Sequence, residues 1–256
     1  MKKIAKSFNS LLKKPVEKFG KEDYHKLRVE IKKLRVILDY GKYCDKKFKR
    51  KKYFKTFKKI FKQSGKIREY QLEESVLKKY EQYSIAQYLM DIENRIKKEE
   101  NKIPSMLDKE FWKKANKAFG DIDASIKKLD EQKVDEFTKS VRSKIKDIIL
   151  PGYLEPEQVH PLRKLLKVDY YNRKFLDLKD QEKITREEDN FLTMLGEWND
   201  CHTMNNQLEK SIAQEKIDPT LLLQLLKLDA EILLNSENLL KDINSRLSLK
   251  RLPFFI

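Results

Sequence analysis

Two groups of basic side chains, each led by a histidine, repeat similar residue types at the same spacing. Arginine offers forked donors to phosphate oxygens, lysine offers a mobile positive charge, and protonated histidine can donate from either ring nitrogen. These residue types in this order predict the binding of an anion. The first stripe is His25, Arg28, Lys32 and Arg35, and the second stripe is His160, Arg163, Lys167, Tyr170 and Lys174.

Helical geometry places each stripe along one line. At about 100° per residue, Arg28, Lys32 and Arg35 fall within about 80° of His25 and border the apolar face of the same helix. Side chains spread along about 15 Å of helix suit a ligand with repeated negative charge better than one compact phosphate. A solvated face would explain either stripe alone, but it has no need to repeat this spacing. We therefore expect one extended anion to lie against both stripes in a common channel.

The second stripe has a further feature at its start. Pro161 is expected in the first helical turn, where its missing N–H is harmless. His160 would then lie near free backbone N–H groups and the positive end of the helix dipole, and both favour an anion.

A second pair of matching segments follows the stripes. Gly65 follows His25 by 40 residues, and Gly196 follows His160 by 36. The segments are Gly65-Lys66-Ile67-Arg68-Glu69 and Gly196-Glu197-Trp198-Asn199-Asp200. Arg68 is a candidate for direct anion contact, whereas Asn199 and Asp200 are expected to cap a helix that begins there, with orientation of the stripe by hydrogen bonds as the alternative.

Long helices must position these residues. Outside residues 150–161, the glycines and prolines stand singly between long stretches that contain neither residue, which favours an all-α fold. Apolar periodicity predicts helices at 22–43, 48–63, 66–90, 91–102, 107–119, 133–149, 157–178, 184–196, 198–214 and 220–248.

The densest cluster of helix breakers, at 150–156, is expected to link two parts of the chain. Residues 1–20 would then form an N-terminal extension, 21–150 a first helical bundle and 151–256 a second. The repeated motifs predict that the two antiparallel bundles are related by an internal pseudo-two-fold axis.

Charge and composition narrow the class of partner. The formal net charge is +16, which attracts nucleic acid, anionic membrane surfaces or polyphosphate. Neither a run of about 18 apolar residues nor a secretion signal is found, so no membrane span is expected. Cys44 and Cys201 are far apart in sequence and form no metal-ligand spacing, which is typical of a reducing cytoplasm.

The sequence predicts a binding protein without catalytic chemistry, cofactor or metal. Hydrolysis of a phosphate polymer would need metal-holding carboxylates or an activated nucleophile. Cys201 and His202 would project about 100° apart on a helix, which argues against a catalytic pair. We expect His202 to pack or to cap a helix.

These motifs together resemble the CHAD family, named for its conserved histidines and α-helical domain. The resemblance covers about residues 20–245. It depends on four segments, which are His25-x-x-Arg28-Val29-x-x-Lys32-Lys33-Leu34-Arg35, Gly65-x-x-Arg68-Glu69, His160-x-x-Arg163-x-x-x-Lys167 and Leu195-Gly196-Glu197-Trp198-Asn199-Asp200.

The resemblance implies paired helical bundles whose basic surface binds inorganic polyphosphate and often directs proteins to polyphosphate granules. It adds Lys33 to the binding residues. Tyr170 and Tyr171 stand where the family commonly has Arg-Tyr, and Glu69 stands where Asp is usual, so the second stripe is expected to bind more weakly. The chain lacks the Glu-x-Glu-x-Lys run of an associated triphosphate-hydrolysing domain, which suggests a stand-alone binding domain. The predicted polyphosphate contacts are His25, Arg28, Lys32, Lys33, Arg35, Arg68, His160, Arg163, Lys164, Lys167 and Lys174.

Two other functions compete with polyphosphate binding. Nucleic-acid binding would use the charge and the aromatics within residues 51–59, although aromatics at helical spacing more often pack in a core. The third candidate is a basic helical adaptor for an acidic protein partner.

Overall fold

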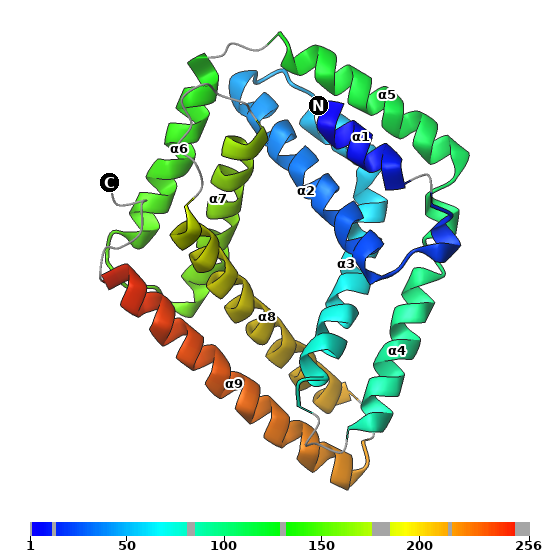
Figure 1. The fold of residues 1–256 in the computed structure, drawn as a ribbon, viewed down its shortest axis with the longest axis vertical. Coiled ribbons are helices and arrows are strands. Elements are labelled where there is room, and N and C mark those ends of the chain that lie inside the picture. Colours follow the sequence, from blue (N-terminus) through cyan, green and yellow to red (C-terminus); the bar gives the residue numbers. More distant parts are fainter. Residues whose placement is uncertain are drawn as a thin grey trace. The chain divides into compact units, whose positions relative to one another are not determined.

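The computed structural model describes residues 2–11, 14–80, 85–128, 132–175, 185–214 and 217–248, and within these ranges the chain is helical with no strand (Figure 1). This confirms the predicted all-α fold. The elements are α1 (Lys2–Leu11), η1 (Val16–Lys18), α2 (Lys21–Cys44), α3 (Arg50–Leu77), α4 (Ala86–Glu100), η2 (Pro104–Met106), α5 (Lys109–Ile126), α6 (Gln132–Ile149), α7 (Pro156–Phe175), α8 (Arg186–Gln214) and α9 (Pro219–Ser248).

The chain divides into two compact units. The first unit comprises 1–74 and 90–137, and the second comprises 75–89 and 138–256. Helices α3, α4 and α6 therefore each contribute residues to both units. The pseudo-two-fold relation and the common channel stay predictions.

The predicted linker at 150–156 lies inside the second unit. It forms the turn between α6 and α7, where Gly152 has a φ of 74°, a conformation that suits glycine. Asn244 of α9 holds this turn from both sides: its Oδ1 accepts from Leu154 N at 2.7 Å, and its Nδ2 donates to Leu154 O at 3.1 Å. These bonds fasten the segment to α9, so it turns the chain within one unit instead of joining two.

Residues 1–20 are not an extension, because α1 contributes to the core of the first unit. Ile4, Phe8 and Leu11 are buried there. The Phe8 ring lies 5.3 Å from the Trp112 ring and 5.4 Å from the Phe119 ring, in edge-to-face geometry. The sequence predicted no helix here, because the segment is short and rich in lysine, and only packing against α2 and α5 buries its apolar side.

Gly65 and Gly196 do not end helices, contrary to the predicted breaks at 63–66 and 196–198. Helix α3 continues through Gly65, and α8 continues through Gly196. Helix α3 ends at Leu77, so the helix predicted at 66–90 is shorter than expected. A glycine costs a helix only about 1 kcal/mol relative to alanine. Burial of neighbouring apolar residues, including Ile67 and Leu195, outweighs that cost.

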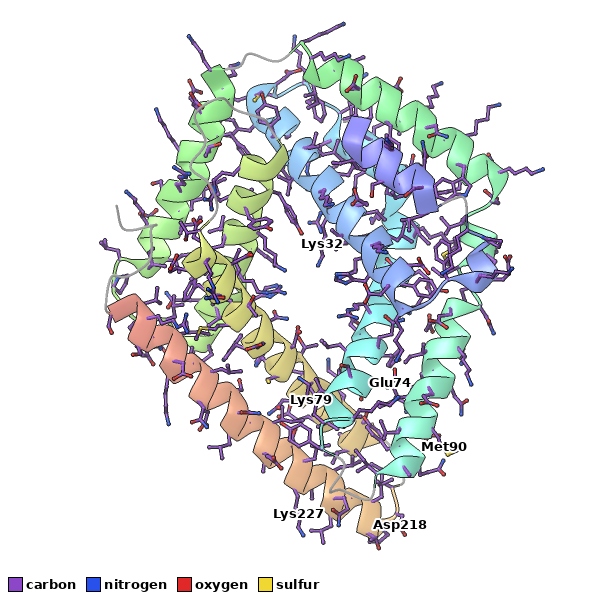
Figure 2. The ribbon with its side chains drawn as sticks, in the orientation of Figure 1. Lys32, Glu74, Lys79, Met90, Asp218 and Lys227 are labelled. Atoms are coloured by element: carbon purple, nitrogen blue, oxygen red, sulfur yellow. The ribbon has the colours of Figure 1, made fainter. Side chains whose placement is uncertain are left out.

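In the second unit α8 packs along α7 and α9 (Figure 1). Local caps define where α8 and α9 begin. Thr185 and Glu188 form a capping box at the start of α8, with bonds of 2.7 and 3.2 Å. Asp218 Oδ1 accepts from Thr220 N and Leu221 N, which begins α9 (Figure 2). These caps explain why the predicted starts at 184 and 220 were close to the observed ones.

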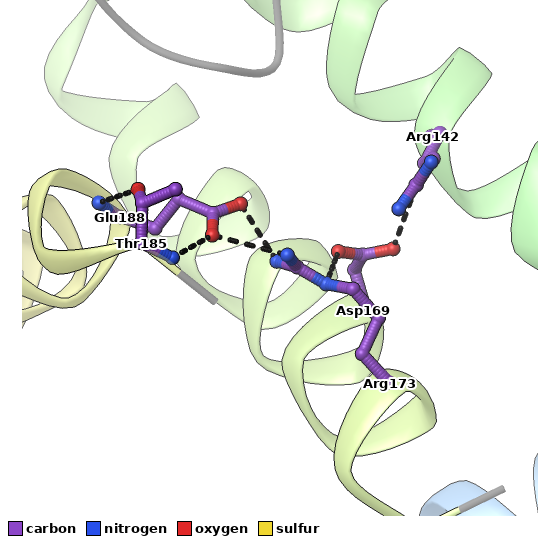
Figure 3. A network of polar contacts seen from close by, with 5 residues as sticks. All are labelled: Arg142, Asp169, Arg173, Thr185 and Glu188. Atoms are coloured by element: carbon purple, nitrogen blue, oxygen red, sulfur yellow. Dashed lines mark hydrogen bonds and ion pairs between the residues drawn. The ribbon is translucent and has the colours of Figure 1, made fainter. Parts of the chain in front are cut away.

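A buried network of ion pairs connects three helices of the second unit (Figure 3). Arg173 of α7 donates two hydrogen bonds, of 3.0 and 2.8 Å, to Glu188 of α8. Its Nε lies 2.9 Å from Asp169, which also accepts from Arg142 of α6 at 3.2 Å. Arg173, Asp169 and Glu188 are almost fully buried. Loss of any one of them would leave a buried charge without its partner, which is strongly destabilising. The network holds α7, and therefore the second stripe, against α6 and α8.

Candidate anion-binding sites

The first stripe lies along α2 beside its buried face. Leu27 and Ile31 are almost fully buried, whereas Arg28, Lys32 and Arg35 are half-buried and His25 is exposed. Figure 2 shows Lys32 on the side of α2 that is turned away from α1. The first stripe therefore lies at the border of the core, as the helical spacing of the sequence predicted.

Arg28 is seated on α3. Its Nη1 donates to the carbonyl oxygen of Phe61 at 3.1 Å, and its guanidinium carbon lies 4.6 Å from the centre of the Phe61 ring. A Cβ atom at Gly65 would lie only 2.7 Å from Arg28 Nη1, closer than van der Waals contact permits. Gly65 is therefore the seat of Arg28, and this close approach explains a glycine in the middle of a long helix.

The arginines of the first unit act on one another. Burial lowers the pKa of Arg28, the nearby Arg35 and Arg68 charges lower it further, and the Glu69 carboxylate raises it. Arg35 also lies over the Phe54 and Phe61 rings, at 5.6 and 5.4 Å. The structure thus places Arg68 electrostatically beside the first stripe. Three guanidinium groups opposed by one carboxylate form a site in which a bound anion would relieve repulsion.

Lys33 is engaged within the first unit. Its Nζ lies 2.5 Å from Glu30 Oε1, and the Glu30 side chain is buried. The two residues are three apart on α2, a spacing that brings side chains together on a helix. Lys33 therefore neutralises a buried carboxylate, a role that the sequence pattern did not indicate.

Arg163 repeats the arginine and glycine arrangement in the second unit. A Cβ atom at Gly196 of α8 would lie 3.9 Å from Arg163 Nε and Nη2, which is ordinary contact. Burial lowers the pKa of Arg163, while Asp200 and Tyr171 raise it. Within the described residues, the buried Nε of Arg163 has no hydrogen-bond partner. The seat is looser than that of Arg28, and one donor remains to be satisfied.

His160 is oriented by α8. Its Nδ1 lies 2.7 Å from Asn199 Oδ1, so with the amide oxygen accepting, Nδ1–H donates. The predicted capping role of Asn199 and Asp200 is wrong, because α8 runs unbroken from Arg186 and both residues lie in its middle. Asn199 instead performs the orienting role, and Asp200 acts on Arg163.

The expected start of the second stripe is also corrected. Helix α7 begins at Pro156, so Pro161 lies inside the helix and not in its first turn. His160 is thus further from the positive end of the helix dipole than predicted, and the dipole falls off within about one turn. A second proline at the true start, with good helix formers after it, explains the shift.

Lys167 of the second stripe has a lowered pKa. Its pKa is lowered to about 8, first by burial and then by the Arg163 charge, although Asp200 raises it. An ammonium with this pKa loses its charge within a unit or two of neutral pH. Lys164 is exposed, and Lys174 lies in α7 with its side chain outside the described residues.

Cys201 and His202 are both packed against neighbouring groups of α8 or partly buried there. The His202 ring stacks on Trp198, with ring centres 4.9 Å apart and planes inclined by 10°, which confirms that His202 packs. Burial raises the pKa of the Cys201 thiol, as do the nearby Asp200 and Glu197 carboxylates, while Lys79 lowers it. Burial and these carboxylates therefore favour the neutral thiol, the less nucleophilic form.

Comparisons with protein-family models, curated proteins and solved structures gave no match for this chain. No helix within the described ranges is long and apolar enough to cross a membrane. In the same ranges, no group of three or more His, Cys, Asp or Glu side chains is arranged to hold a metal ion. The sites must therefore be interpreted from their own geometry.

The sequence singled out Gly65 and Glu69, but it did not indicate that they and Phe61 hold Arg28. Phe61, Gly65 and Glu69 follow one another at intervals of four on α3, so they face the same neighbour. The signal was present in this spacing, but the glycine was interpreted as a break. The equivalent line in α8 includes Gly196 and Asp200.

Proposed function

We propose that the chain binds inorganic polyphosphate along the two stripes, each unit holding a segment of the polymer, and that this binding brings the protein to polyphosphate granules in the cytoplasm. One observation supports this proposal most strongly. In each unit an arginine packs against a glycine in the middle of a helix, Arg28 against Gly65 and Arg163 against Gly196. Each arginine has a lysine four residues later and a carboxylate four residues after the glycine. This order is the one on which the resemblance to the CHAD family also depends.

The electrostatics support a linear polyanion. Arg28 and Arg163 have pKa values lowered chiefly by burial, so each cation is held partly out of water and gains by contact with an anion. Guanidinium groups bind phosphate oxygens in a forked geometry. Together with a net charge of +16, the half-buried cations favour repeated phosphates along each stripe.

The aromatic side chains near the basic run 51–59 argue against single-stranded nucleic acid as the preferred ligand. Phe57 is fully buried in the first core, and Tyr53 and Phe54 pack against that core. Bases bind such proteins by stacking on accessible rings. Because these rings pack in the core, only the positive charge of the segment is left to attract nucleic acid. Polyphosphate binds to that charge equally well.

Charge reversal tests this proposal. Polyphosphate affinity would be measured for Arg28→Glu with Lys32→Glu, and for a control that reverses Lys97 and Lys98, exposed lysines of α4 outside both stripes. We expect the stripe variant to lose at least about tenfold in affinity, or about 1.4 kcal/mol, and the control less than about threefold. Circular dichroism should stay unchanged in both.

Competition at one salt concentration separates the ligands, because both show steep salt dependence. Polyphosphate should displace single-stranded RNA at equal phosphate concentration. If RNA displaced polyphosphate, nucleic-acid binding would replace the proposal. If the stripe variant and the control lost affinity equally, net charge alone would explain the binding.

A further inference from the structure

We propose that a cavity in the first unit binds a compact ligand that carries two or more phosphate groups and has the size of a nucleoside triphosphate. The cavity has a volume of about 550 Å³ and lies where α2 and α5 end and α3 and α6 begin. It is independent of the proposed function, because it uses no residue of either stripe. Its charged walls are Asp45, Lys47, Lys49, Lys52, Asp121, Lys128 and Lys133.

The walls carry five lysines against two aspartates. Within the described part of the chain, the ammonium groups of Lys47, Lys49, Lys52 and Lys128 take part in no ion pair. Like charges gathered around one hollow repel one another, and a multiply charged anion removes that repulsion.

Two other charged side chains of the cavity, those of Lys133 and Asp45, form hydrogen bonds with backbone groups. Lys133 Nζ donates to the carbonyl oxygen of Cys44 at 3.0 Å, which satisfies the end of α2. Asp45 Oδ1 accepts from Lys47 N at 2.7 Å, which stabilises the turn into α3. These contacts build the rim, and they leave the four unpaired lysines to face the ligand.

The cavity also has an apolar wall. The Phe48 and Tyr53 rings lie 5.3 Å apart, and the Tyr53 hydroxyl is 3.1 Å from Ser125 Oγ, which fixes the ring. A volume of this size falls in the range of small-molecule sites. Phosphates on the lysines with a sugar against this apolar wall would use both walls. Phosphate recognition is the shared chemistry, and the source is a nucleotide or a short inorganic phosphate chain.

The test is isothermal titration of the full chain with three probes, namely ATP, tripolyphosphate and adenosine, at one salt concentration. We expect ATP or tripolyphosphate to bind and adenosine not to bind. ATP binding more tightly than tripolyphosphate would identify a nucleotide site, and equal affinities would identify an inorganic phosphate site. Adenosine binding as tightly as ATP, or no binding of either phosphate probe, would overturn the proposal.

Variants locate the site. Lys52→Glu with Lys128→Glu should weaken ATP or tripolyphosphate by at least about tenfold. The equal charge change at Lys97 and Lys98 should weaken it by less than about threefold, with thermal unfolding followed for each variant. Asp121→Asn removes a carboxylate from the wall, so it should tighten binding by about twofold. An equal loss in the control would show attraction to net charge and not a site. A loss on Asp121→Asn would contradict an anion bound against this wall.

The two proposals fail separately. Arg28→Glu should leave the affinity for tripolyphosphate within about twofold of the native value, because Arg28 does not line the cavity. A large loss in that variant would assign the short chain to the first stripe instead.

Discussion

Each unit packs an arginine against a helix glycine, more closely in the first unit than in the second, and the two units surround it differently. In the first unit Arg35 and Arg68 accompany Arg28, and all three are permanent cations. In the second unit Tyr170 and Asn199 occupy the corresponding positions, and the accompanying lysine, Lys167, has a pKa of about 8. The repeat therefore preserves the seat while the charge around it varies. We infer that the first unit binds a polyanion by fixed charge and the second by a charge that depends on pH.

The largest effect is expected from breaking the network that holds the second stripe. Glu188→Ala leaves the buried Arg173 without its bidentate partner, and it removes the bond of the α8 capping box that the Glu188 side chain accepts from Thr185 N. Loss of one partner of a buried pair costs about 3 to 5 kcal/mol. Hydrogen exchange should therefore quicken in 138–256 and not in 1–74. Equal quickening in both ranges would show that the network does not act on one unit alone.

Charge reversal of the two seated arginines comes next. Arg28→Glu should weaken polyphosphate binding by about tenfold at pH 7, and Arg163→Glu by about threefold, because fewer cations surround Arg163. Titration of each variant at fixed salt would measure both. Equal losses would show that the extra arginines of the first unit do not contribute.

The two glycines provide a finer comparison. Gly65→Ala would push Arg28 from its bond to the Phe61 carbonyl, because the new Cβ meets Nη1 at 2.7 Å. Since the arginine end is flexible, we expect about threefold weaker binding with little change in melting temperature. Gly196→Ala meets Arg163 at 3.9 Å, so it should keep its affinity and gain up to about 1 kcal/mol in helix stability. Reversed effects would contradict the difference between the seats.

The last expected effect is a pH dependence confined to the second unit, no larger than the loss expected for Gly65→Ala. The pKa of Lys167 is lowered to about 8, so its ammonium is charged below that pH and neutral above it. In an Arg28→Glu background, affinity for polyphosphate should fall by about threefold as the pH rises from 7 to 9. Lys167→Arg keeps its charge and should give a flat profile. A profile that stays steep in this variant would assign the titration to another group.

The sequence by itself determined that the described chain is helical, and it determined which helix faces carry the two stripes. Apolar periodicity placed α2, α6 and α9 within a residue or two of the observed bounds, and it set each stripe beside a buried face. These features are local, because a helix repeats every 3.6 residues whatever it packs against. The spacing of the paired motifs predicts two related bundles, and that relation stays a prediction.

Only the tertiary structure decided which residues meet across helices. That Gly65 seats Arg28, that Asn199 orients His160 and that burial lowers the pKa of Lys167 depend on how neighbouring helices pack. Single-helix periodicity contains no such distances, so both glycines were taken as helix breaks and α1 was taken as an extension. The physical reason is that a helix face is defined by angle alone, whereas a site requires the separation between two faces.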